Sequence, residues 1–268
     1  MNVAAALAED IGGGDWTAQL IPATKPACAH IITRTDAVIC GAQWFDACFK
    51  TLEAAVTTEW SVREGSSVRA GQTLVTVRGS ARTLLTGERT ALNFLQLLSG
   101  VATITRQYVD AVTGTRAKIV DTRKTVPGLR LAQKYAVRMG GGINHRIGLY
   151  DAILIKENHI AAAGGIAAAM SAAVRVAPPN VWTQIEVENF DQLSAALAAG
   201  AKMILLDNMS TDQMREAVKI TGGRAELEAS GGITLDNVRA IAETGVDRIS
   251  VGGLTKDIKA VDLSMRFD

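Results

Sequence analysis

Cysteine is scarce in this sequence: its 268 residues hold three, Cys28, Cys40 and Cys48. Their number is odd and no two have CxxC spacing, so we expect neither a disulfide framework nor a thiolate zinc site. So few cysteines fit a reducing compartment, and we expect a cytoplasmic protein. Prolines number only five and no low-complexity tract occurs, so the composition gives no sign of wholesale disorder.

Long apolar runs and an excess of charge are also missing. No segment reaches 18 consecutive apolar residues, so no membrane span is expected. No basic segment precedes the short apolar run at the start, so no signal peptide is expected either. The 28 Lys and Arg residues nearly balance the 27 Asp and Glu residues, for a net charge of +1. This balance argues against nucleic-acid binding through basicity. The 48% apolar and 21% charged fractions are those of a globular protein.

The small net charge conceals an asymmetry along the chain. Residues 116–156 contain nine basic residues and two acids, so this stretch carries +7 and the rest carries −6. Arg130, Lys134 and Arg138 are spaced four apart, which fits a solvated helix face. Four other cations of the stretch do not share that face: Arg123, Lys124, Arg146 and Lys156.

Apolar runs alternate with helical patterns in the second half of the chain, which predicts βαβ units and a parallel sheet. Strands are expected at 117–122, 152–157, 183–188, 202–207, 225–230 and 248–253. Helices are expected at 128–139, 164–175, 190–199, 211–220 and 235–244. Polar or glycine residues stand at the end of each strand, which favours a (β/α) barrel over an open sheet. Only six strands are visible, so an incomplete barrel stays open.

The first hundred residues read as a separate α/β domain. Residues 51–79 alternate apolar and polar side chains and resemble lipoyl or biotinyl carrier domains, but they lack the Met-Lys hairpin, so we interpret them as scaffold. Residues 81–112 are expected to be helical, with a break near Ser99 and Gly100. We place the domains at 1–100 and 101–253, with the tail 254–268 returning to the first.

A barrel mouth would bring the four unassigned cations together. Confined like charges repel, so the cluster indicates a polyanionic ligand. Salt bridges to Glu186, Glu188 or Asp207 are the plain structural alternative. Lys156 has a rival role, because a lysine at a strand end can form a Schiff base.

Other strand ends carry weaker signals. Glu186 and Asp207 are carboxylates that could hold a metal, ribose hydroxyls or a developing positive charge. The double glycines of 229–233 and 250–255 fit phosphate binding through backbone N–H groups. His145 lies among the cations, whereas His159 fits support of Lys156 and His30 fits scaffold. No histidine metal motif occurs.

Long motifs then give the chain a specific resemblance. It contains, in order, ERTALNFLQLLSGVAT, VDTRKTVPGLR, KYAVRMGGGINHRIGLYDAILIKENH, IEVEN, LLDNM, LEASGGIT and SVGGLT. These segments resemble the quinolinate phosphoribosyltransferase family over nearly the whole chain. The resemblance implies a type II phosphoribosyltransferase fold, in which a mixed α/β N-terminal domain accompanies an open, seven-stranded TIM-like barrel. It also implies phosphoribosyl transfer from 5-phosphoribosyl-1-pyrophosphate to quinolinate, with Mg²⁺ and loss of CO₂, giving nicotinate mononucleotide for NAD synthesis.

The resemblance also implies a site, residue by residue. Its substrate-binding residues would be Arg89, Thr122, Arg123, Lys124, His145, Arg146, Lys156, Glu186, Asp207, Ser230, Gly231, Gly232, Val251, Gly252 and Gly253. Lys124, Glu186 and Asp207 would be catalytic, and the two acids would face the metal. Arg89 would reach the neighbouring subunit's site in a homodimer, with a hexamer of dimers as a further possibility.

Three departures from the family pattern are mild: Val126, Glu157 and Gly253 replace Thr, Asp and Ala. Three alternatives stay open from the sequence. One is the molybdenum-transport-associated paralogue of the same fold, another a Schiff-base aldolase that uses Lys156, and the third a carrier-like binding module built on 51–79.

Overall fold

The structure, a computed structural model, describes residues 2–268 and divides into two compact units. Unit 1 takes the chain up to Arg106, together with Val126–Gly141 and Thr255–Asp268, and unit 2 takes Gln107–Thr125 and Gly142–Leu254. The predicted division at residue 100 differs from this one chiefly at 126–141, which clusters with unit 1. The reason is packing within that unit, because the side chain of Gln133 donates to the carbonyl of Thr255 at 2.9 Å and Trp44 stacks against Tyr135.

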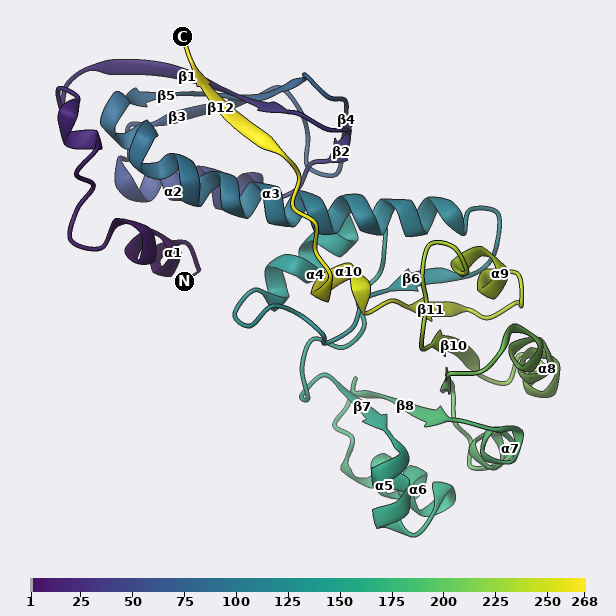
Figure 1. The fold of residues 1–268 in the computed structure, drawn as a ribbon. Coiled ribbons are helices and arrows are strands. Elements are labelled where there is room, and N and C mark those ends of the chain that lie inside the picture. The colour runs from purple at the N-terminus through teal and green to yellow at the C-terminus, as the bar shows by residue number, and fades with distance from the viewer. Residues whose placement is uncertain (1) are drawn as a thin grey trace. The chain divides into compact units, whose positions relative to one another are not determined.

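Unit 1 is built on a four-stranded antiparallel sheet in the order β12-β1-β5-β3 (Figure 1). Its strands are β1 (Pro26–Thr33), β3 (Thr57–Trp60), β5 (Thr73–Ser80) and β12 (Leu263–Phe267), and a small ribbon joins β2 (Ala37–Val38) to β4 (Ser67–Val68). Side chains of β1 alternate between buried and partly exposed, as the sequence pattern indicates. Its helices are α1 (Asn2–Ile11), α2 (Ala42–Leu52), α3 (Ala81–Ala111), of which the last residues belong to unit 2, and α4 (Arg130–Met139), with a 3₁₀ turn at Ala18–Leu20. The apolar core lies between α2, α3 and the sheet and includes Phe45, Phe49 and Leu92.

Helix α3 runs without interruption, so the predicted break near Ser99 and Gly100 is wrong. Both residues serve close packing instead. The Ser99 hydroxyl bonds with the backbone N–H and carbonyl of Cys40, and a Cβ at position 100 would overlap the carbonyl oxygen of Lys259. A second correction concerns α4: Lys134 is buried rather than part of a solvated face, whereas Arg138 is exposed and its guanidinium lies over the Tyr135 ring.

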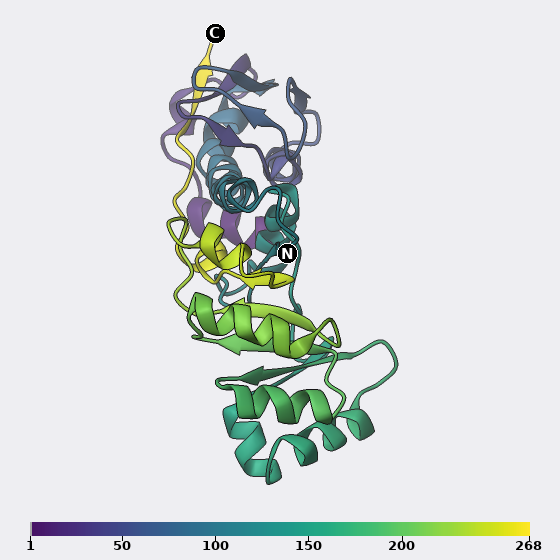
Figure 2. The ribbon, with the colours of Figure 1, turned by 90° about the vertical axis from the view of Figure 1, so that its right-hand side faces the viewer.

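Unit 2 contains a parallel sheet of six strands in the order β6-β11-β10-β9-β8-β7, which confirms the six predicted strands. They are β6 (Lys118–Val120), β7 (Ala152–Ile155), β8 (Trp182–Val187), β9 (Met203–Asp207), β10 (Glu226–Ser230) and β11 (Arg248–Ser250). A single parallel bridge adds Ile143 beside Val120 on β6. The helices are α5 (Glu157–Ala163), α6 (Ile166–Val176), α7 (Phe190–Ala198), α8 (Thr211–Thr221) and α9 (Val238–Ala242), and α10 (Gly253–Lys256) follows β11. Helices α7, α8 and α9 lie along the same side of the sheet (Figures 1 and 2).

Within residues 2–268, no single helix has the length and apolar character needed to cross a membrane. The pair α5 and α6, which meet at 93°, passes such a test jointly on length and composition alone.

Candidate functional site

The carboxyl ends of the six parallel strands surround a pocket of about 280 Å³. This edge is where parallel α/β folds bind ligands. The pocket takes residues from every strand of the sheet or from the loop just after it. Its lining residues are Thr122, Arg123, Lys124, His145, Arg146, Leu154, Lys156, Glu186, Leu205, Asp207, Glu228, Ser230 and Ser250.

The side chains that each strand contributes to the lining stand two residues apart, so they share one face of the sheet. The residues at the strand ends form the mouth of the pocket: Lys156, Glu186, Asp207 and Ser230. Two residues earlier on their strands lie Leu154, Leu205 and Glu228. In register, Asp207 pairs with Ser230, whereas Glu186 pairs with Leu205, so these strand ends are staggered.

Nine of the fifteen predicted site residues line this pocket, including all four of the unassigned cations. Arg123 and Arg146 lie close enough to repel each other. Burial lowers the pKa of the Arg146 guanidinium, the charge of Arg123 lowers it further, and Asp151 opposes both effects. Two guanidinium groups held near each other in a half-buried site favour an anionic ligand.

The mouth also holds two carboxylates, Glu186 and Asp207. The Nζ of Lys156 lies 3.0 Å from Oε2 of Glu186, so the predicted alternative of a salt bridge is present at this position. Burial raises the pKa of the Glu186 carboxyl, the ammonium of Lys156 opposes that rise, and the negative charges of Asp207 and Glu157 add to it. Glu186 and Asp207 line the same pocket from the ends of the neighbouring strands β8 and β9. Carboxylate oxygens are the protein ligands that Mg²⁺ prefers, so these two residues could hold the metal.

Hydrogen bonds fix the tautomer of His145, which is buried. Its Nδ1 accepts from the backbone N–H of Arg146 at 2.8 Å, so Nδ1 carries no proton. Its Nε2 lies 2.8 Å from Oε1 of Gln184, and Nε2 of Gln184 lies 3.1 Å from Oε2 of Glu228. Because a carboxylate only accepts, Gln184 turns its amide toward Glu228 and its carbonyl toward His145. His145 is therefore the Nε2–H form in this arrangement.

Glu228 is the site residue that sequence reasoning missed most clearly. It is 1% exposed, and the Nε of Arg248 lies 3.2 Å from its Oε2 without the alignment of a hydrogen bond. Its other oxygen, Oε1, has no hydrogen-bond partner among the described residues and belongs to a pocket-lining side chain. Spacing places Glu228 on the same face as Ser230, two residues along one strand, but it does not say whether that face lines the pocket. Ser250, Leu154 and Leu205 were missed for the same reason.

The two glycine segments contribute Ser230 and Ser250 to the lining of the pocket, but none of their glycines is among the described lining residues. Gly231 has φ +100°, and a Cβ there would overlap the Asn208 side chain, so only glycine fits. A Cβ at Gly252 would lie 3.1 Å from Cδ of Lys124, which shows how closely this backbone approaches the lysine. Gly232 has φ +61° with open space around it. Val251 is buried and donates to the Val120 carbonyl, and Gly253 begins α10.

Three other candidates are not among the residues that line the pocket. Arg89 is exposed on α3 within unit 1 and is not among the lining residues. Glu188 is exposed beyond the end of β8, so the structure favours Glu186 over it. His159 is exposed, and its Nδ1 accepts from the backbone N–H of Lys156 at 3.0 Å. That bond is the supporting role expected for His159.

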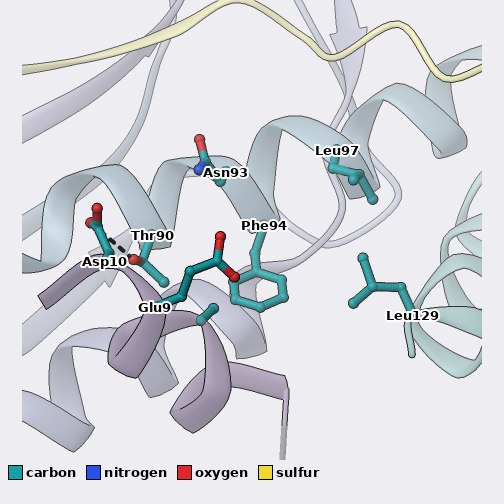
Figure 3. A pocket seen from close by; sticks show the side chains of 8 residues that line it. Glu9, Asp10, Thr90, Asn93, Phe94, Leu97 and Leu129 are labelled. Carbon is teal, nitrogen blue, oxygen red and sulfur yellow. Dashed lines mark hydrogen bonds between the residues drawn. The ribbon is translucent and has the colours of Figure 1, made fainter. Parts of the chain in front are cut away.

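A second pocket, of about 250 Å³, lies within unit 1 between α1 and α3 (Figure 3). Glu9 and Asp10 of α1 face Thr90 and Phe94 of α3, and the Thr90 hydroxyl lies 3.4 Å from Oδ2 of Asp10. The described residues that line it include two acids and no cation. This pocket is therefore unsuited to a polyanionic ligand.

Known families, curated relatives and solved structures match nearly the whole chain. Two family models match, "Quinolinate phosphoribosyl transferase, N-terminal domain" over residues 15–99 and "Quinolinate phosphoribosyl transferase, C-terminal domain" over residues 101–266. A probable nicotinate-nucleotide pyrophosphorylase (carboxylating) of Bacillus subtilis is 44% identical, over 96% of this chain and 89% of its own. The nicotinate-nucleotide pyrophosphorylase (carboxylating) of Mycobacterium leprae is also 44% identical, over 97% and 94%. A solved structure of the nicotinate-nucleotide pyrophosphorylase from Francisella tularensis superposes with a TM-score of 0.97 at 46% identity, covering 100% of this chain and 95% of that one.

Proposed function

The chain belongs to the quinolinate phosphoribosyltransferase family, and we propose that it transfers the phosphoribosyl group of 5-phosphoribosyl-1-pyrophosphate to quinolinate. It is then a decarboxylating pentosyltransferase of NAD synthesis, with nicotinate mononucleotide, pyrophosphate and CO₂ as products. The observation that carries this proposal is the pocket in which four cations converge, with the carboxylates Glu186 and Asp207 at its mouth and Glu228 further in. Both substrates are polyanions, and the cations match their charge.

Each side chain of the pocket has a role in the proposal. Arg123 and Arg146 bind the two carboxylates of quinolinate, since a guanidinium pairs with a carboxylate through two parallel bonds. His145 supports Arg146, because its Nδ1 accepts from the backbone N–H of Arg146. Lys124 and Lys156 neutralise charge nearer the reacting atoms. Thr122 orients Lys124, because its Oγ1 accepts from the backbone N–H of Lys124 at 3.1 Å.

Glu186 and Asp207 act where positive charge develops. Attack of the ring nitrogen on C1 of the ribose passes through an oxocarbenium-like state, which a nearby carboxylate stabilises electrostatically. Loss of CO₂ follows without a further cofactor, because the positively charged ring nitrogen stabilises the electron pair left on the neighbouring ring carbon, and that carbon then takes up a proton from water. Two glycine segments, Ser230–Gly232 and Val251–Gly253, would receive phosphate oxygens through backbone N–H groups.

Mg²⁺ is part of this proposal. Glu186 and Asp207 would hold it, largely through water and the donor's phosphates, because Mg²⁺ keeps several waters and few protein ligands. When bound, the ion neutralises charge on the departing pyrophosphate. The repulsion between the two carboxylates supports a cation at this place.

Several finer features of the family are extended to this chain as proposals. The parallel bridge of Ile143 to β6 supports a seventh strand of an open barrel. The exposure of Arg89 supports a homodimer in which this arginine completes the neighbouring site, with a hexamer of dimers as a larger assembly. Free Cys28, Cys40 and Cys48 support a cytoplasmic location.

Two alternatives lose support. A Schiff-base lysine must be an uncharged amine, whereas Lys156 forms an ion pair with Glu186. A carrier role for 51–79 would need an exposed lysine hairpin, and that stretch instead contributes β3 and β5 to the sheet of unit 1.

Incubation with quinolinate, the phosphoribosyl donor and Mg²⁺ tests the proposal, with nicotinate as the matched acceptor that has one carboxylate fewer. We expect nicotinate mononucleotide from quinolinate and little or none from nicotinate. Equal turnover of both acceptors, or none of quinolinate by folded protein, would contradict it.

Subunit mixing tests the proposed role of Arg89. Arg89→Ala and Lys124→Ala are each expected to be inactive alone, and hybrid dimers are expected to regain part of the activity because one of their two sites is intact. If exchange of subunits is demonstrated and no activity returns, Arg89 does not act across the dimer.

A further inference from the structure

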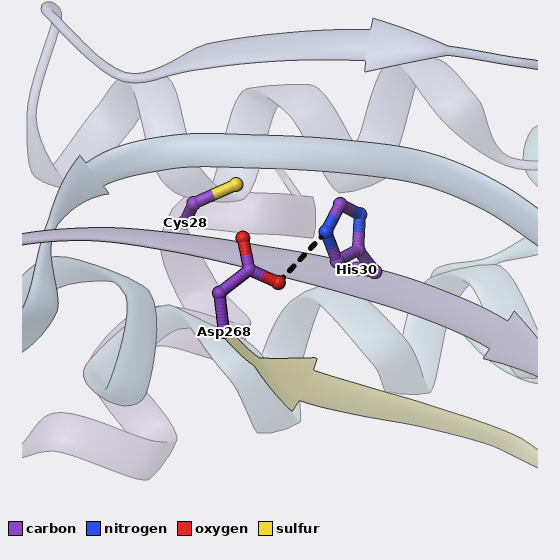
Figure 4. A group of neighbouring side chains, drawn as sticks. All are labelled: Cys28, His30 and Asp268. Carbon is purple, nitrogen blue, oxygen red and sulfur yellow. Dashed lines mark ion pairs between the residues drawn. The ribbon is translucent and has the colours of Figure 1, made fainter.

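Three potential metal ligands gather at one edge of the sheet of unit 1, in a unit of the chain separate from the pocket (Figure 4). Cys28 and His30 stand two apart on β1, so their side chains share a face of the strand. Asp268 directly follows β12, the antiparallel neighbour of β1, and its backbone N–H donates to the Cys28 carbonyl at 3.2 Å. One ligand atom from each of the three side chains lies within 4.8 Å of the other two.

The imidazole of His30 is oriented for metal binding. Its Nδ1 lies 3.1 Å from the hydroxyl of Thr76 on β5, and its Nε2 lies 2.9 Å from Oδ1 of Asp268. Metal-binding histidines characteristically use one ring nitrogen for the metal and give the other to a hydrogen bond that fixes the ring. Thr76 supplies that second contact, so Nε2 is the nitrogen directed at the cluster.

Cys28 differs from the other cysteines in its access to solvent. It is half-buried, whereas Cys40 and Cys48 are buried, and burial raises the pKa of the Cys48 thiol to about 12. The pKa of the Cys28 thiol is raised mainly by its hydrogen bond to Asp268 and also by burial, while the charge of Arg78 opposes the rise. A metal ion that binds between Cys28 and Asp268 would take the place of the thiol proton.

We propose that Cys28, His30 and Asp268 form a surface site for Zn²⁺ or a similar thiophilic divalent cation. A thiolate, a neutral imidazole and a carboxylate are the ligand types of protein zinc sites, and water would complete a four-coordinate shell. The thiolate and the carboxylate together balance the charge of the ion. Such a site would replace two sequence-based expectations, that His30 is only scaffold and that the chain has no thiolate zinc site.

Charged side chains near the cluster affect its affinity for a cation. The cross-strand partner of Cys28 on β5 is Arg78, which lies 3.8 Å from Glu59 of β3, and the partner of His30 on β12 is Arg266. The positive charges of both arginines disfavour a bound cation. Strong binding therefore needs the negative charges of the Cys28 thiolate and the Asp268 carboxylate. Binding displaces the thiol proton of Cys28 into solvent, and affinity is therefore expected to rise with pH.

The site would tie β12 to β1 and so join segments that are far apart in the sequence. A ligand that binds only the folded form stabilises it. Zn²⁺ is therefore expected to raise the melting temperature of the wild-type chain.

Metal titration of the full chain, with saturating Mg²⁺ present, tests the site. Co²⁺ is added first, because a thiolate bound to Co²⁺ gives a charge-transfer absorption that oxygen-only sites lack, and Zn²⁺ is then titrated by calorimetry. We expect one ion per chain and a thiolate band, both lost in Cys28→Ser. Thr76→Val, which removes only the outer contact to His30, is expected to weaken Zn²⁺ binding roughly 10–100-fold.

Asp262→Asn is the matched control, an exposed acid just before β12 that lies outside the cluster, and it is expected to bind Zn²⁺ like the wild type. Retained turnover of quinolinate by every variant shows that each is folded. If quinolinate turnover proves absent from the wild type too, circular dichroism replaces it as the folding check, so the two proposals fail independently. Absence of the thiolate band in the wild type, or unchanged Zn²⁺ affinity in Cys28→Ser, would overturn the site.

Discussion

At the scale of single residues, the charge state of Glu186 depends on three neighbours. Lys156 lowers the pKa of its carboxyl, while Asp207 and Glu157 raise it, and burial raises it most. The carboxylate form is the one that stabilises a developing oxocarbenium. Because the pKa is raised, this form is lost as pH falls through a higher value than that of an exposed glutamate. Activity is therefore expected to decline on the acidic side earlier than an unperturbed carboxyl would cause.

Lys156→Met is expected to move the acidic limb of the kcat profile to higher pH, because the ammonium no longer favours the ionised carboxyl. Glu157→Gln is the opposite case: it removes a negative charge from an exposed residue outside the pocket, so the limb is expected to move to lower pH. Measurement of kcat against pH for the three proteins checks both directions. Equal profiles would mean that Glu186 does not set the acidic limb.

Glu228→Gln is expected to destabilise the protein by as much as about 3–5 kcal/mol, the cost of removing one partner of a buried ion pair. Arg248 then keeps only its longer contact with Glu226, at 3.8 Å, and Gln184 faces a neutral amide in place of a carboxylate. The double variant Glu228→Gln, Arg248→Met is expected to lose less than the sum of the single variants. Chemical denaturation of the four proteins gives these free energies, and strict additivity would show that the pair is not coupled.

Sequence reasoning found most pocket residues at the strand ends. It missed Leu154, Leu205 and Glu228, which stand two residues earlier on their strands. Lys124, Glu186 and Asp207 follow recognisable apolar runs, so their position could be predicted from the pattern. Glu228 lies inside a strand, where a single alternating pattern does not say which face points into a barrel. Its burial depends on the long-range pairing of β10 with β9 and β11, which the sequence alone does not reveal.

At the scale of elements, the strand and helix pattern of unit 2 was predictable because each element carries its own apolar period and end signals. The Ser210 side chain, for example, caps α8 and accepts from the backbone N–H of Gln213, whose side chain in turn accepts from the Ser210 backbone N–H. The continuity of α3 was not predictable. Gly100 has the same sequence signature whether it ends a helix or admits another segment, and the deciding contact, Lys259, lies far along the chain.

Gly100→Ala is expected to destabilise the protein, although alanine is the better helix former by about 1 kcal/mol. The new Cβ would overlap the Lys259 carbonyl, and backbone there moves less easily than a side chain. We expect a net loss of about 1–2 kcal/mol in unfolding free energy. Gln107→Ala, at an exposed position of the same helix, is the control and is expected to change little. Stabilisation by Gly100→Ala would show that the close approach is absent.

At the scale of the whole molecule, a net charge of +1 averages two opposite regions. The basic stretch 116–156 supplies the four cations of the pocket, yet part of it, the helix α4, belongs to unit 1 and buries Lys134. The charge excess of this stretch is consistent with a polyanionic ligand, but it does not identify which of its cations line the pocket. Spacing from strand ends, rather than charge density, separated the two groups.

In the proposed reaction, loss of CO₂ depends on prior phosphoribosyl transfer in this pocket. The most direct measurement follows quinolinate labelled in the carboxylate beside the ring nitrogen, and compares labelled CO₂ with nicotinate mononucleotide, with and without the phosphoribosyl donor. We expect equal amounts of both products when the donor is present and no CO₂ without it, because only the ribosylated ring stabilises the electron pair. Release of CO₂ without donor, or the absence of the mononucleotide, would contradict the account.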